Sequence, residues 1–502
     1  MRQFLLLLLS ISCTAAFSQR YQEDTAGARK LYNAELSLAA FATSNDQVPF
    51  WMRANQFGSI PLDGTSASVI GKLSKSYNYD GTKRLLDWGF GLDLRLNAGK
   101  DFEFIPVEAY VKGRLGIFQL KAGRSKDISG LVDSTLSTGS YAISGNALGI
   151  PKVELSVPEF WNVPFLGKVV AFKGSFSHGW MGDSPIQYGE FNGSSVETYF
   201  HNASLHGRFG KVEWPVKFYG GINHEVIWGS DKLIFGDQYS LSGADAFWHV
   251  ITGKKYVKDG LKRDISKIGN HLGAIDLGLE LETENLKFFG YRQQFYDKGA
   301  LAYLANAEDG LTGLSITNKR KSDSPWQWQK FLLEVFYSKG QAGEANVKET
   351  PSGVEYYYNH AVYTEGYSYR GLGLGNPLVT SAKLARRDLP NDPINYFINN
   401  RVVAFHLGTQ GVLQNWSYQI KLTYSQNYGE YRASDIPYWY NGNRYERVPE
   451  YGIFPKVNQF SGFLEASRPL KNGLFLGVTL AGDQGKLLYN SFGGSVKVFK
   501  RW

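Results

Sequence analysis

Eight histidines are the first residues whose chemistry could define a function, either as metal ligands or as general bases. The chain has no HExxH motif, and the closest histidine pair is His201 and His206. Residues five apart on a β-strand point to opposite faces, so these two imidazoles are not expected to share a metal. We interpret the histidines as hydrogen-bonded residues of a lumen or an interface, and we expect neither a metal nor another cofactor.

Three carboxylates offer a second chemistry, because Asp276, Glu280 and Glu282 would share one face of a strand. Paired carboxylates can flank a glycosidic bond as acid and base. A polar lumen also holds such groups in ion pairs, with residues like Arg95 and Lys421 as partners. We therefore predict no catalytic residue and no enzyme, and keep a glycan or lipid hydrolase as the weaker alternative.

The glycine-rich stretch GLGLGN (371–376) raises a third chemistry, nucleotide binding. A dinucleotide fingerprint needs a glycine where Asn376 stands, and it opens a helix after a strand. This stretch lies instead among β-type segments, so its glycines are interpreted as a tight turn or a close backbone approach. The chain also has no G-x-S-x-G nucleophile elbow.

The elements that must position these residues are predicted to be β-strands. The 502 residues include 56 Gly, 31 Tyr, 32 Phe and 12 Trp, and after the N-terminal region no stretch is apolar enough for a spanning helix. Apolar and polar residues alternate in 89–97, 275–282 and 416–425. Segments of about 9 to 10 residues with one apolar face fit strands that cross a membrane.

A soluble β-sandwich would show the same alternation, so three further features decide between the two classes. Apolar faces end in aromatic residues such as Trp88 and Trp416, as in membrane girdles. The chain ends in SVKVFKRW, an alternating segment with a terminal aromatic residue. Tight turns, as at 283–285 and 471–473, contrast with long polar stretches near 127–150, 230–270, 340–356 and 430–456. We predict an all-β fold, a transmembrane outer-membrane antiparallel barrel of roughly 16 to 20 strands.

The N-terminal sequence MRQFLLLLLSISCTAAFSQR predicts a cleavable export signal over residues 1–18. Arg2 supplies positive charge, 4–11 an apolar core and 16–18 a small-x-small cleavage site. A membrane anchor would need about 20 apolar residues, and Cys13 lacks a lipidation box. Residues 19–502 then form a single barrel domain without cysteine, located in the outer membrane.

Net charge and loop composition bear on the partner. Lys and Arg outnumber Asp and Glu by 54 to 46, for a formal charge of +8. Export removes nucleic acid as a partner and leaves lipopolysaccharide phosphates and acidic polysaccharides. In 431–452, aromatic rings alternate with amide and guanidinium groups, which could stack on sugars and donate to their hydroxyls and carboxylates. A girdle or a loop plug would use the same residues, so both interpretations stay open.

Sequence blocks spaced through the mature chain resemble the Wzi-type capsule assembly proteins of Gram-negative outer membranes. They are PFWMRANQFGSIP (49–61), VPEFWNVPFLGKVVAFKGSFSHGWMGD (157–183), TYFHNASLHGRFG (198–210), YGGINHEVIWG (219–229), YRQQFYDKG (291–299) and YYYNHAVYTEGYSYRGLGLGNPL (356–378). The resemblance implies a monomeric barrel of about 18 strands, plugged at its outer end by its own loops, that acts as a lectin. Such a protein would bind capsular or exported polysaccharide at the cell surface, with outer-membrane lipid and lipopolysaccharide around it.

The resemblance also implies a set of candidate ligand-binding residues at the matched positions. These are Trp51, Arg53, Asn55, His178, Trp180, His201, Asn223, His224, Trp228, Arg292, Tyr296, Tyr357, Asn359, His360 and Asn376, together with Gly375. The long loops 230–270 and 430–456 match no family pattern, so the identity of the polysaccharide stays open. A porin or diffusion channel is the main alternative, because a polar lumen would also serve it.

Two local expectations concern strand boundaries. YYYNHAVY (356–363) is interpreted as the end of a loop entering a membrane strand, with alternate residues on its two faces. The segment 24–36 is a candidate for a short helix on the periplasmic side.

Overall fold

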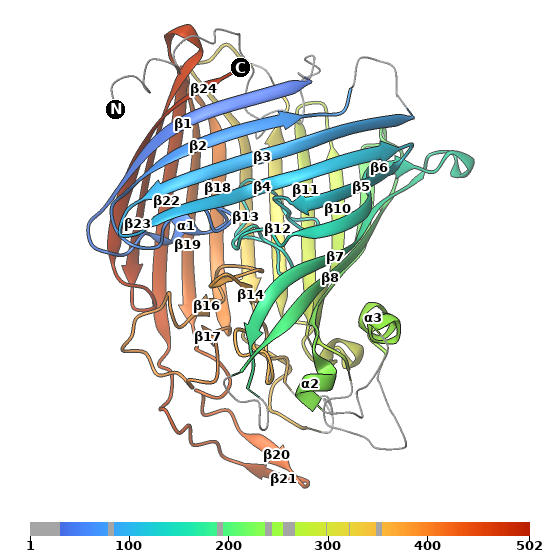
Figure 1. The fold of residues 1–502 in the computed structure, drawn as a ribbon, viewed down its shortest axis with the longest axis vertical. Coiled ribbons are helices and arrows are strands. Elements are labelled where there is room, and N and C mark those ends of the chain that lie inside the picture. The colour runs from blue at the N-terminus through green and yellow to red at the C-terminus, as the bar shows by residue number, and fades with distance from the viewer. Residues whose placement is uncertain are drawn as a thin grey trace.

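A closed antiparallel β-barrel forms the body of the computed structural model, which describes residues 31–78, 85–187, 194–235, 243–254, 267–297, 299–320, 322–347 and 354–502. The predicted fold is therefore confirmed. Consecutive strands are neighbours, and the last pairs with the first to close the barrel (Figure 1). Among the described residues, the 18 barrel strands are β1 (Tyr32–Thr43), β2 (Ser66–Lys75), β3 (Leu86–Ala98), β4 (Phe102–Leu115), β5 (Phe118–Arg124), β6 (Lys152–Asn162), β7 (Val170–Pro185), β8 (Ser195–Phe209), β9 (Val216–Trp228), β10 (Asn270–Glu282), β11 (Leu286–Tyr296), β12 (Gly310–Asn318), β13 (Trp326–Tyr337), β18 (Val402–Leu413), β19 (Trp416–Asn427), β22 (Val457–Pro469), β23 (Leu474–Gly485) and β24 (Ser491–Arg501).

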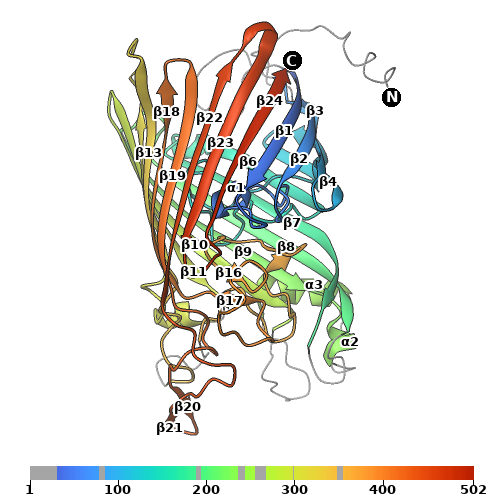
Figure 2. The same cartoon turned by 90° about the vertical axis from the view of Figure 1, so that its left-hand side faces the viewer.

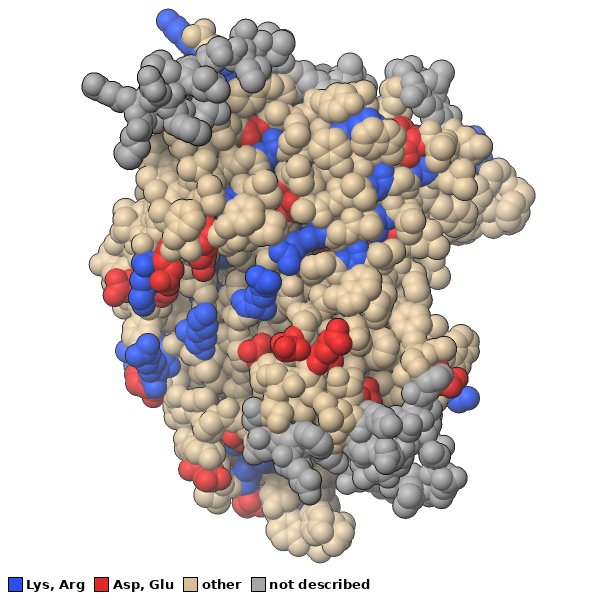
Figure 3. Space-filling model, in the orientation of Figure 1, with Lys and Arg blue, Asp and Glu red and all other residues tan. Residues whose placement is uncertain are grey.

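The predicted alternation sets the two faces of the wall. On β3, Leu92 and Leu94 are exposed on the outside, while Asp93 and Arg95 are buried on the inside. The same division holds on β10 and β19. An apolar outer face suits contact with acyl chains, because lipid cannot hydrogen-bond to polar side chains. In the space-filling view, uncharged side chains make up most of the visible face of the described chain (Figure 3).

The two ends of the barrel differ in the length of their connections. One end carries the N- and C-termini and the short turns. Two of these turns are 3-10 turns, η1 (Pro164–Leu166) and η5 (Lys471–Gly473). The other end carries the long loops, with α2 (Asp231–Phe235), α3 (Gly243–Thr252) and the hairpin β20–β21 (Tyr438–Tyr440 and Asn443–Tyr445) (Figures 1 and 2). Outer-membrane barrels have short periplasmic turns and long extracellular loops, so the loop end faces outward.

Three inward-folded segments fill the barrel between its two ends, and we call them the plug. They are residues 44–65 with α1 (Phe50–Arg53), residues 125–151, and the described parts of 338–401. The last segment carries four short strands, β14 (Ser368–Tyr369), β15 (Leu372–Gly373), β16 (Thr380–Ser381) and β17 (Phe397–Asn399). The segments are bonded to one another, as where Gly58 N donates to Asn146 O at 3.0 Å and Ser144 Oγ to Gly375 O at 2.6 Å.

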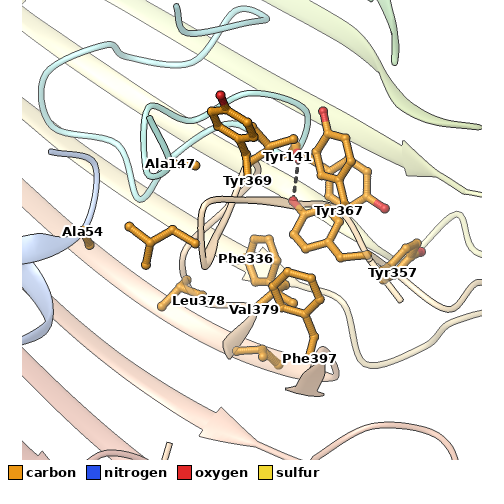
Figure 4. Packing of buried hydrophobic residues seen from close by; sticks show 14 of the residues in the cluster. Ala54, Tyr141, Ala147, Phe336, Tyr357, Tyr367, Tyr369, Leu378, Val379 and Phe397 are labelled. Atoms are coloured by element: carbon orange, nitrogen blue, oxygen red, sulfur yellow. Dashed lines mark hydrogen bonds between the residues drawn. The ribbon is translucent and has the colours of Figure 1, made fainter. Parts of the chain in front are cut away.

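Aromatic rings form the core of the plug. Tyr141 stacks on Phe295 of the wall, with ring centroids 4.2 Å apart, and meets Tyr357 edge-on at 5.5 Å. Tyr367 and Phe397 close the group from other parts of the plug, beside Phe336 of β13 (Figure 4). These buried rings join the plug to the wall by apolar packing as well as by hydrogen bonds.

Two local expectations were wrong within the described residues. The stretch 356–363 contains no barrel strand, and the next one, β18, begins only at Val402. Tyr357 and Tyr358 are both fully buried, because the plug and the wall pack around these two rings and remove the two-faced pattern of a wall strand. Residues 32–36 of the candidate N-terminal helix belong to β1, and residues 24–30 lie outside the described residues, as does the predicted signal 1–18.

No helix among the described residues has the length and apolarity to cross a membrane. The longest is α3, with 10 residues, and it lies outside the barrel wall near β8 (Figure 1). The 3-10 turn η4 (Ala300–Tyr303) belongs to the loop-end connection between β11 and β12.

Candidate functional site

The first of two hollow regions lies in the lumen, between the plug and the end that carries the termini, with a volume of about 980 Å³. Charged side chains alternate in sign across its wall. Lys72 lies 3.6 Å from Glu35 and 3.9 Å from Asp93, and Lys126 of the plug pairs with Asp93 and, at 3.7 Å, with Glu108. Because each charge has a partner of opposite sign, we interpret this row as structural.

The second hollow region, the loop-end pocket, opens at the outward end of the barrel and has a volume of about 910 Å³. Two long loops supply most of its lining, the β13–β18 loop and the β19–β22 loop. The β13–β18 loop contributes residues 354, 356, 359–361, 392 and 394–395, and the β19–β22 loop contributes residues 431–433 and 447–452. Residues 267, 269–271, 297 and 345 complete the lining. The plug therefore forms its inner wall.

Arginine and tyrosine side chains dominate the chemistry of one side of the loop-end pocket. The Arg447 guanidinium lies 4.6 Å from the ring centre of Tyr431 and 5.2 Å from that of Tyr438, and its Nε donates to Ile436 O at 3.3 Å. Its two terminal nitrogens have no hydrogen-bond partner among the described residues. Tyr451 is 48% exposed beside it. A stacked, pre-positioned guanidinium suits a carboxylate or hydroxyl ligand.

A buried carboxylate holds the rim of the loop-end pocket in shape. Glu430 accepts hydrogen bonds from Tyr356 Oη, from Arg432 N at 2.6 Å and from Ala433 N at 2.7 Å. Burial raises the pKa of the Glu430 carboxyl, although these donors act in the opposite direction. Asp392 approaches Arg432 at 3.3 Å on the same rim. The two loops are thereby joined to each other at the mouth of the pocket.

The sequence matches one protein family. A family model described as capsule assembly protein Wzi matches residues 30–385, more than half of the chain. The chain belongs to this family. The matched region covers the barrel from β1 and most of the plug, and it ends before β18, so it excludes the β19–β22 loop that lines the loop-end pocket.

Solved structures are similar to this Wzi-family chain in fold alone. Pseudomonas aeruginosa OpdQ is 9% identical with a TM-score of 0.45, covering 94% of this chain and 99% of that chain. Acinetobacter baumannii OccAB4 is 9% identical with a TM-score of 0.43, covering 94% and 98%. Pseudomonas aeruginosa OccK5 (OpdH) is 10% identical with a TM-score of 0.43, covering 95% and 99%. No curated protein sequence matches the chain.

Two of the residues carried over from the Wzi resemblance line the loop-end pocket, Asn359 and His360. The Asn359 amide pairs with the backbone of Phe397, donating to its O at 2.8 Å and accepting from its N at 2.9 Å. His360 Nδ1 accepts from Val362 N at 3.2 Å and Tyr363 N at 3.3 Å. Both side chains therefore shape the loop around the pocket.

Other residues from the Wzi resemblance hold the plug to the wall or to itself. Trp51 Nε1 donates to Thr423 Oγ1 at 3.0 Å, and Arg53 Nε donates to Val48 O at 3.3 Å. Asn55 Nδ2 donates to Thr138 O at 2.9 Å, Asn376 Nδ2 donates to Thr138 Oγ1 at 3.2 Å, and Tyr357 Oη donates to Asp309 Oδ2 at 2.6 Å. Trp51 and Asn55 also border the lumen cavity.

A further group from the resemblance lies on the outer wall of the barrel, away from both cavities. It comprises His178, Trp180, His201, His224 and Trp228, which strand alternation directs outward from β7, β8 and β9. Arg292 and Tyr296 are also directed outward, from β11, where Arg292 donates to Thr312 Oγ1 at 2.8 Å and Tyr296 Oη to Asn223 O at 2.9 Å. The histidine and tryptophan side chains lie close to one another, as the ring contacts His178–Trp180, His178–Trp228 and His201–His224 show, and none of the seven residues lines the loop-end pocket.

Carboxylates inside the barrel are bound to wall residues. Asp276 accepts from Asn223 Nδ2 at 2.7 Å and from Gln293 Nε2 at 2.8 Å, and it lies 2.9 Å from His206 Nε2. Glu280 lies 2.7 Å from Lys217 Nζ. His206 thus faces the lumen while His201 faces outward, as strand geometry predicts.

The expected partners Arg95 and Lys421 do not bind these acids. Arg95 donates instead to Asn97 Oδ1 at 2.8 Å, and Lys421 Nζ lies 4.5 Å from the ring centre of Trp51. Within the described ranges, no three His, Cys, Asp or Glu side chains are grouped so as to hold a metal ion.

Arg447, Tyr431, Tyr451, Arg432 and Asp392 are the pocket residues that sequence reasoning did not select. The aromatic and basic character of 431–452 left a binding surface and a girdle or loop plug open as interpretations of this loop, and no family block assigned residues within it. Asp392 carried no signal of its own, because its role depends on the approach of Arg432 from another loop.

Proposed function

We propose that the protein binds capsular or other exported polysaccharide in the loop-end pocket and holds the polymer at the cell surface without chemical turnover. The supporting observation is the position of the pocket, at the outward end and above the plug, with Arg447 stacked on two tyrosines. Membership of the Wzi capsule assembly family supports the same role.

The chemistry of the loop-end pocket suits a saccharide. Tyrosine rings stack on the C–H faces of sugars, and the Arg447 fork can bind a sugar carboxylate or two hydroxyls. The volume of about 910 Å³ lies in the range of roughly 300 to 1,000 Å³ typical of small-molecule sites. The pocket would therefore hold a short section of the chain while the rest of the polymer stays outside.

A porin is the competing function, and the plug argues against it. His406 Nε2 lies 2.8 Å from Leu136 O of the plug, and Gln419 Nε2 donates to Thr135 O at 2.7 Å. Such bonds fix the plug across the lumen from several wall strands. We propose a barrel that stays closed, and that acts as a monomer because β1–β24 pairing leaves no open edge among the described barrel strands.

Binding of purified polysaccharide to the purified barrel tests the proposal. The polymer is taken from the cells that carry the gene, and affinity is measured for the wild type, Arg447→Ala and Arg444→Ala. We expect Arg447→Ala to bind about tenfold more weakly, because charge-assisted bonds are lost. Arg444 is the matched control, since it lies on the same loop, bonds Glu344 at 2.8 Å and does not line the pocket. Equal binding by all three proteins would contradict the proposal.

A further inference from the structure

Four imidazoles lie on the outer wall of the barrel, on the four adjacent strands β7 to β10. His178 and His201 are register partners on β7 and β8, and His224 Nε2 lies 3.0 Å from His271 Nδ1. His201 and His224 have ring centroids 6.1 Å apart. We call His178, His201, His224 and His271, with Trp228, the outer-wall cluster. Polar groups are costly on a wall that faces lipid, so the cluster requires a partner.

Three buried nitrogens of the outer-wall cluster, His178 Nδ1, His201 Nε2 and Trp228 Nε1, have no hydrogen-bond partner among the described residues, and the last two have opposite hydrogen-bonding needs. His201 Nδ1 lies 3.0 Å from the carbonyl oxygen of Ser177, which can only accept, so Nδ1 carries the proton and Nε2 is an acceptor. His201 is 0% exposed, and its Nε2 has no hydrogen-bond partner among the described residues. Trp228 is 9% exposed, and its Nε1–H donor also has none there. A complementary ligand must donate to one and accept from the other.

Helix α3 covers the outer-wall cluster from outside. The Phe247 ring lies 5.6 Å from His178, 5.8 Å from His201 and 5.9 Å from Trp228, measured between ring centroids. On the next residue of the helix, Trp248 is 58% exposed. In Figure 1, α3 lies beside β8 toward the loop end, which is the level of the outer-leaflet headgroups.

Exposed apolar side chains continue from the cluster along the membrane-facing wall. Phe176 and Trp180 flank His178 on β7, and Leu205 and Ile222 follow on β8 and β9. The cluster is thus continuous with the surface that contacts lipid. A molecule bound here would place its polar part against the imidazoles and its acyl chains against this wall.

We propose that the outer-wall cluster binds the saccharide headgroup of an outer-leaflet glycolipid, with α3 as a movable cover. A sugar hydroxyl can donate to His201 Nε2 and accept from Trp228 Nε1, and sugar C–H faces pack on the surrounding rings. A phosphocholine headgroup has acceptors but no hydrogen-bond donor, so it would satisfy Trp228 and leave His201 Nε2 without a donor. A sugar headgroup is therefore distinguished from a phosphocholine lipid by a single hydrogen bond.

Lipid binding to the full-length purified barrel tests this inference. The probes are rough lipopolysaccharide, which keeps a short sugar headgroup, and phosphatidylcholine, whose headgroup has no hydrogen-bond donor, and the retained lipid is counted by native mass spectrometry. We expect the wild type to prefer rough lipopolysaccharide, and His201→Phe, which keeps a ring but removes the acceptor, to lose about tenfold in affinity for it. His201→Phe should leave phosphatidylcholine binding unchanged.

Further variants separate a binding role from a structural one. Trp228→Phe removes the donor and should weaken lipopolysaccharide binding as His201→Phe does, and it replaces that variant if His201→Phe fails to fold. Phe247→Ala loosens the cover and should strengthen binding. Phe405→Leu, on the outer wall of β18, is the control and should change nothing. Wild-type affinity in folded His201→Phe or Trp228→Phe, or equal affinity of the wild type for both lipids, would overturn the inference.

Discussion

Glu35 and Arg501 meet across the seam where the barrel closes, with Arg501 Nε donating to Glu35 Oε2 at 2.8 Å. Lys497 Nζ of the same last strand bonds Glu35 Oε1 at 3.0 Å. Glu35 lies on β1, so one carboxylate of the first strand binds two cations of β24. Strand pairing at the seam joins residues that are 450 to 466 positions apart in the sequence, and this carboxylate helps to select the correct pair.

Replacing Glu35 should destabilise the closed barrel. In Glu35→Gln, Lys497 and Arg501 keep their charges and lose their shared partner, which costs on the order of 3 kcal/mol for a largely buried group. We expect a lower temperature for the mobility shift of the barrel in heated, detergent-loaded gels. Glu103→Gln, at an exposed position of β4, is the control. An unchanged transition in Glu35→Gln would show that backbone pairing alone secures the seam.

Removing Glu334 should loosen the plug. Glu334 of β13 accepts from Ser137 Oγ and Thr138 N of the plug, both at 2.7 Å, and from Tyr291 Oη of the wall. Glu334→Ala leaves these donors unpaired inside the barrel, so we expect openings in planar-bilayer recordings that the wild type lacks. Glu284→Gln, on a short turn, should resemble the wild type. Steady open channels in the wild type itself would favour the porin alternative.

The attachment of the plug should weaken as pH rises. Burial raises the pKa of the Asp309 carboxyl to about 6 from an ordinary value of 3.8, although Tyr357 Oη and the N–H groups of Gln341 and Gly340 lower it. Because the pKa of Asp309 is higher in the folded protein than in the unfolded chain, the protonated carboxyl contributes to the stability of the plug. This contribution is complete below about pH 4 and is lost as the pH rises through about 6. Hydrogen exchange of 338–347 should be faster at pH 7.5 than at pH 5, beyond the intrinsic pH effect.

Asp309→Asn is the variant that assigns this pH dependence. It keeps the shape of the side chain and cannot ionise, so the difference between the two pH values should shrink. Glu430 has a pKa raised by burial as well, so part of the difference should remain. A pH response identical to that of the wild type would exclude Asp309 as its source.

A methyl group at Gly375 should disrupt the aromatic core of the plug. An added Cβ would overlap Tyr358 Oη and the Tyr141 carbonyl oxygen, which are bonded to each other. We expect Gly375→Ala to cost about 1 to 3 kcal/mol of plug stability, as overpacking does. Limited proteolysis within 354–401 should then become faster. Gly71→Ala, with no atom within 4 Å of the added methyl, should not change cleavage.

The barrel wall could be predicted from sequence because lipid imposes a strict pattern on it. Outward positions such as Leu92 and Leu277 must be apolar, and their neighbours Asp93 and Asp276 face a polar interior, so period-two alternation appears directly. The contrast between short turns and long loops follows from the same asymmetry. Nothing comparable constrains the plug, because much of it packs against the wall or against itself inside the barrel.

The stretch from Tyr356 to Tyr363 shows why the alternation of apolar and polar residues does not predict the structure of the plug. Tyr357 and Tyr358 are adjacent and both fully buried, which no wall strand allows. The family blocks were equally ambiguous about roles, since a match in residue type does not show which face of a strand the residue occupies. His201 is matched like Asn359, although one lies on the outer wall and the other lines the loop-end pocket. The pocket itself depends on two loops that meet only in space.

Hydrogen exchange of the purified barrel with and without its exported polysaccharide tests the central claim most directly. If the loop-end pocket binds the polymer, protection should appear in 354–361, 392–395, 431–433 and 447–452 together, and the plug segment 127–150, which does not line that pocket, should be unchanged. Arg447→Ala should reduce that protection, and Arg444→Ala should not. Protection confined to the lumen side, or no protection at saturating polymer, would contradict the account.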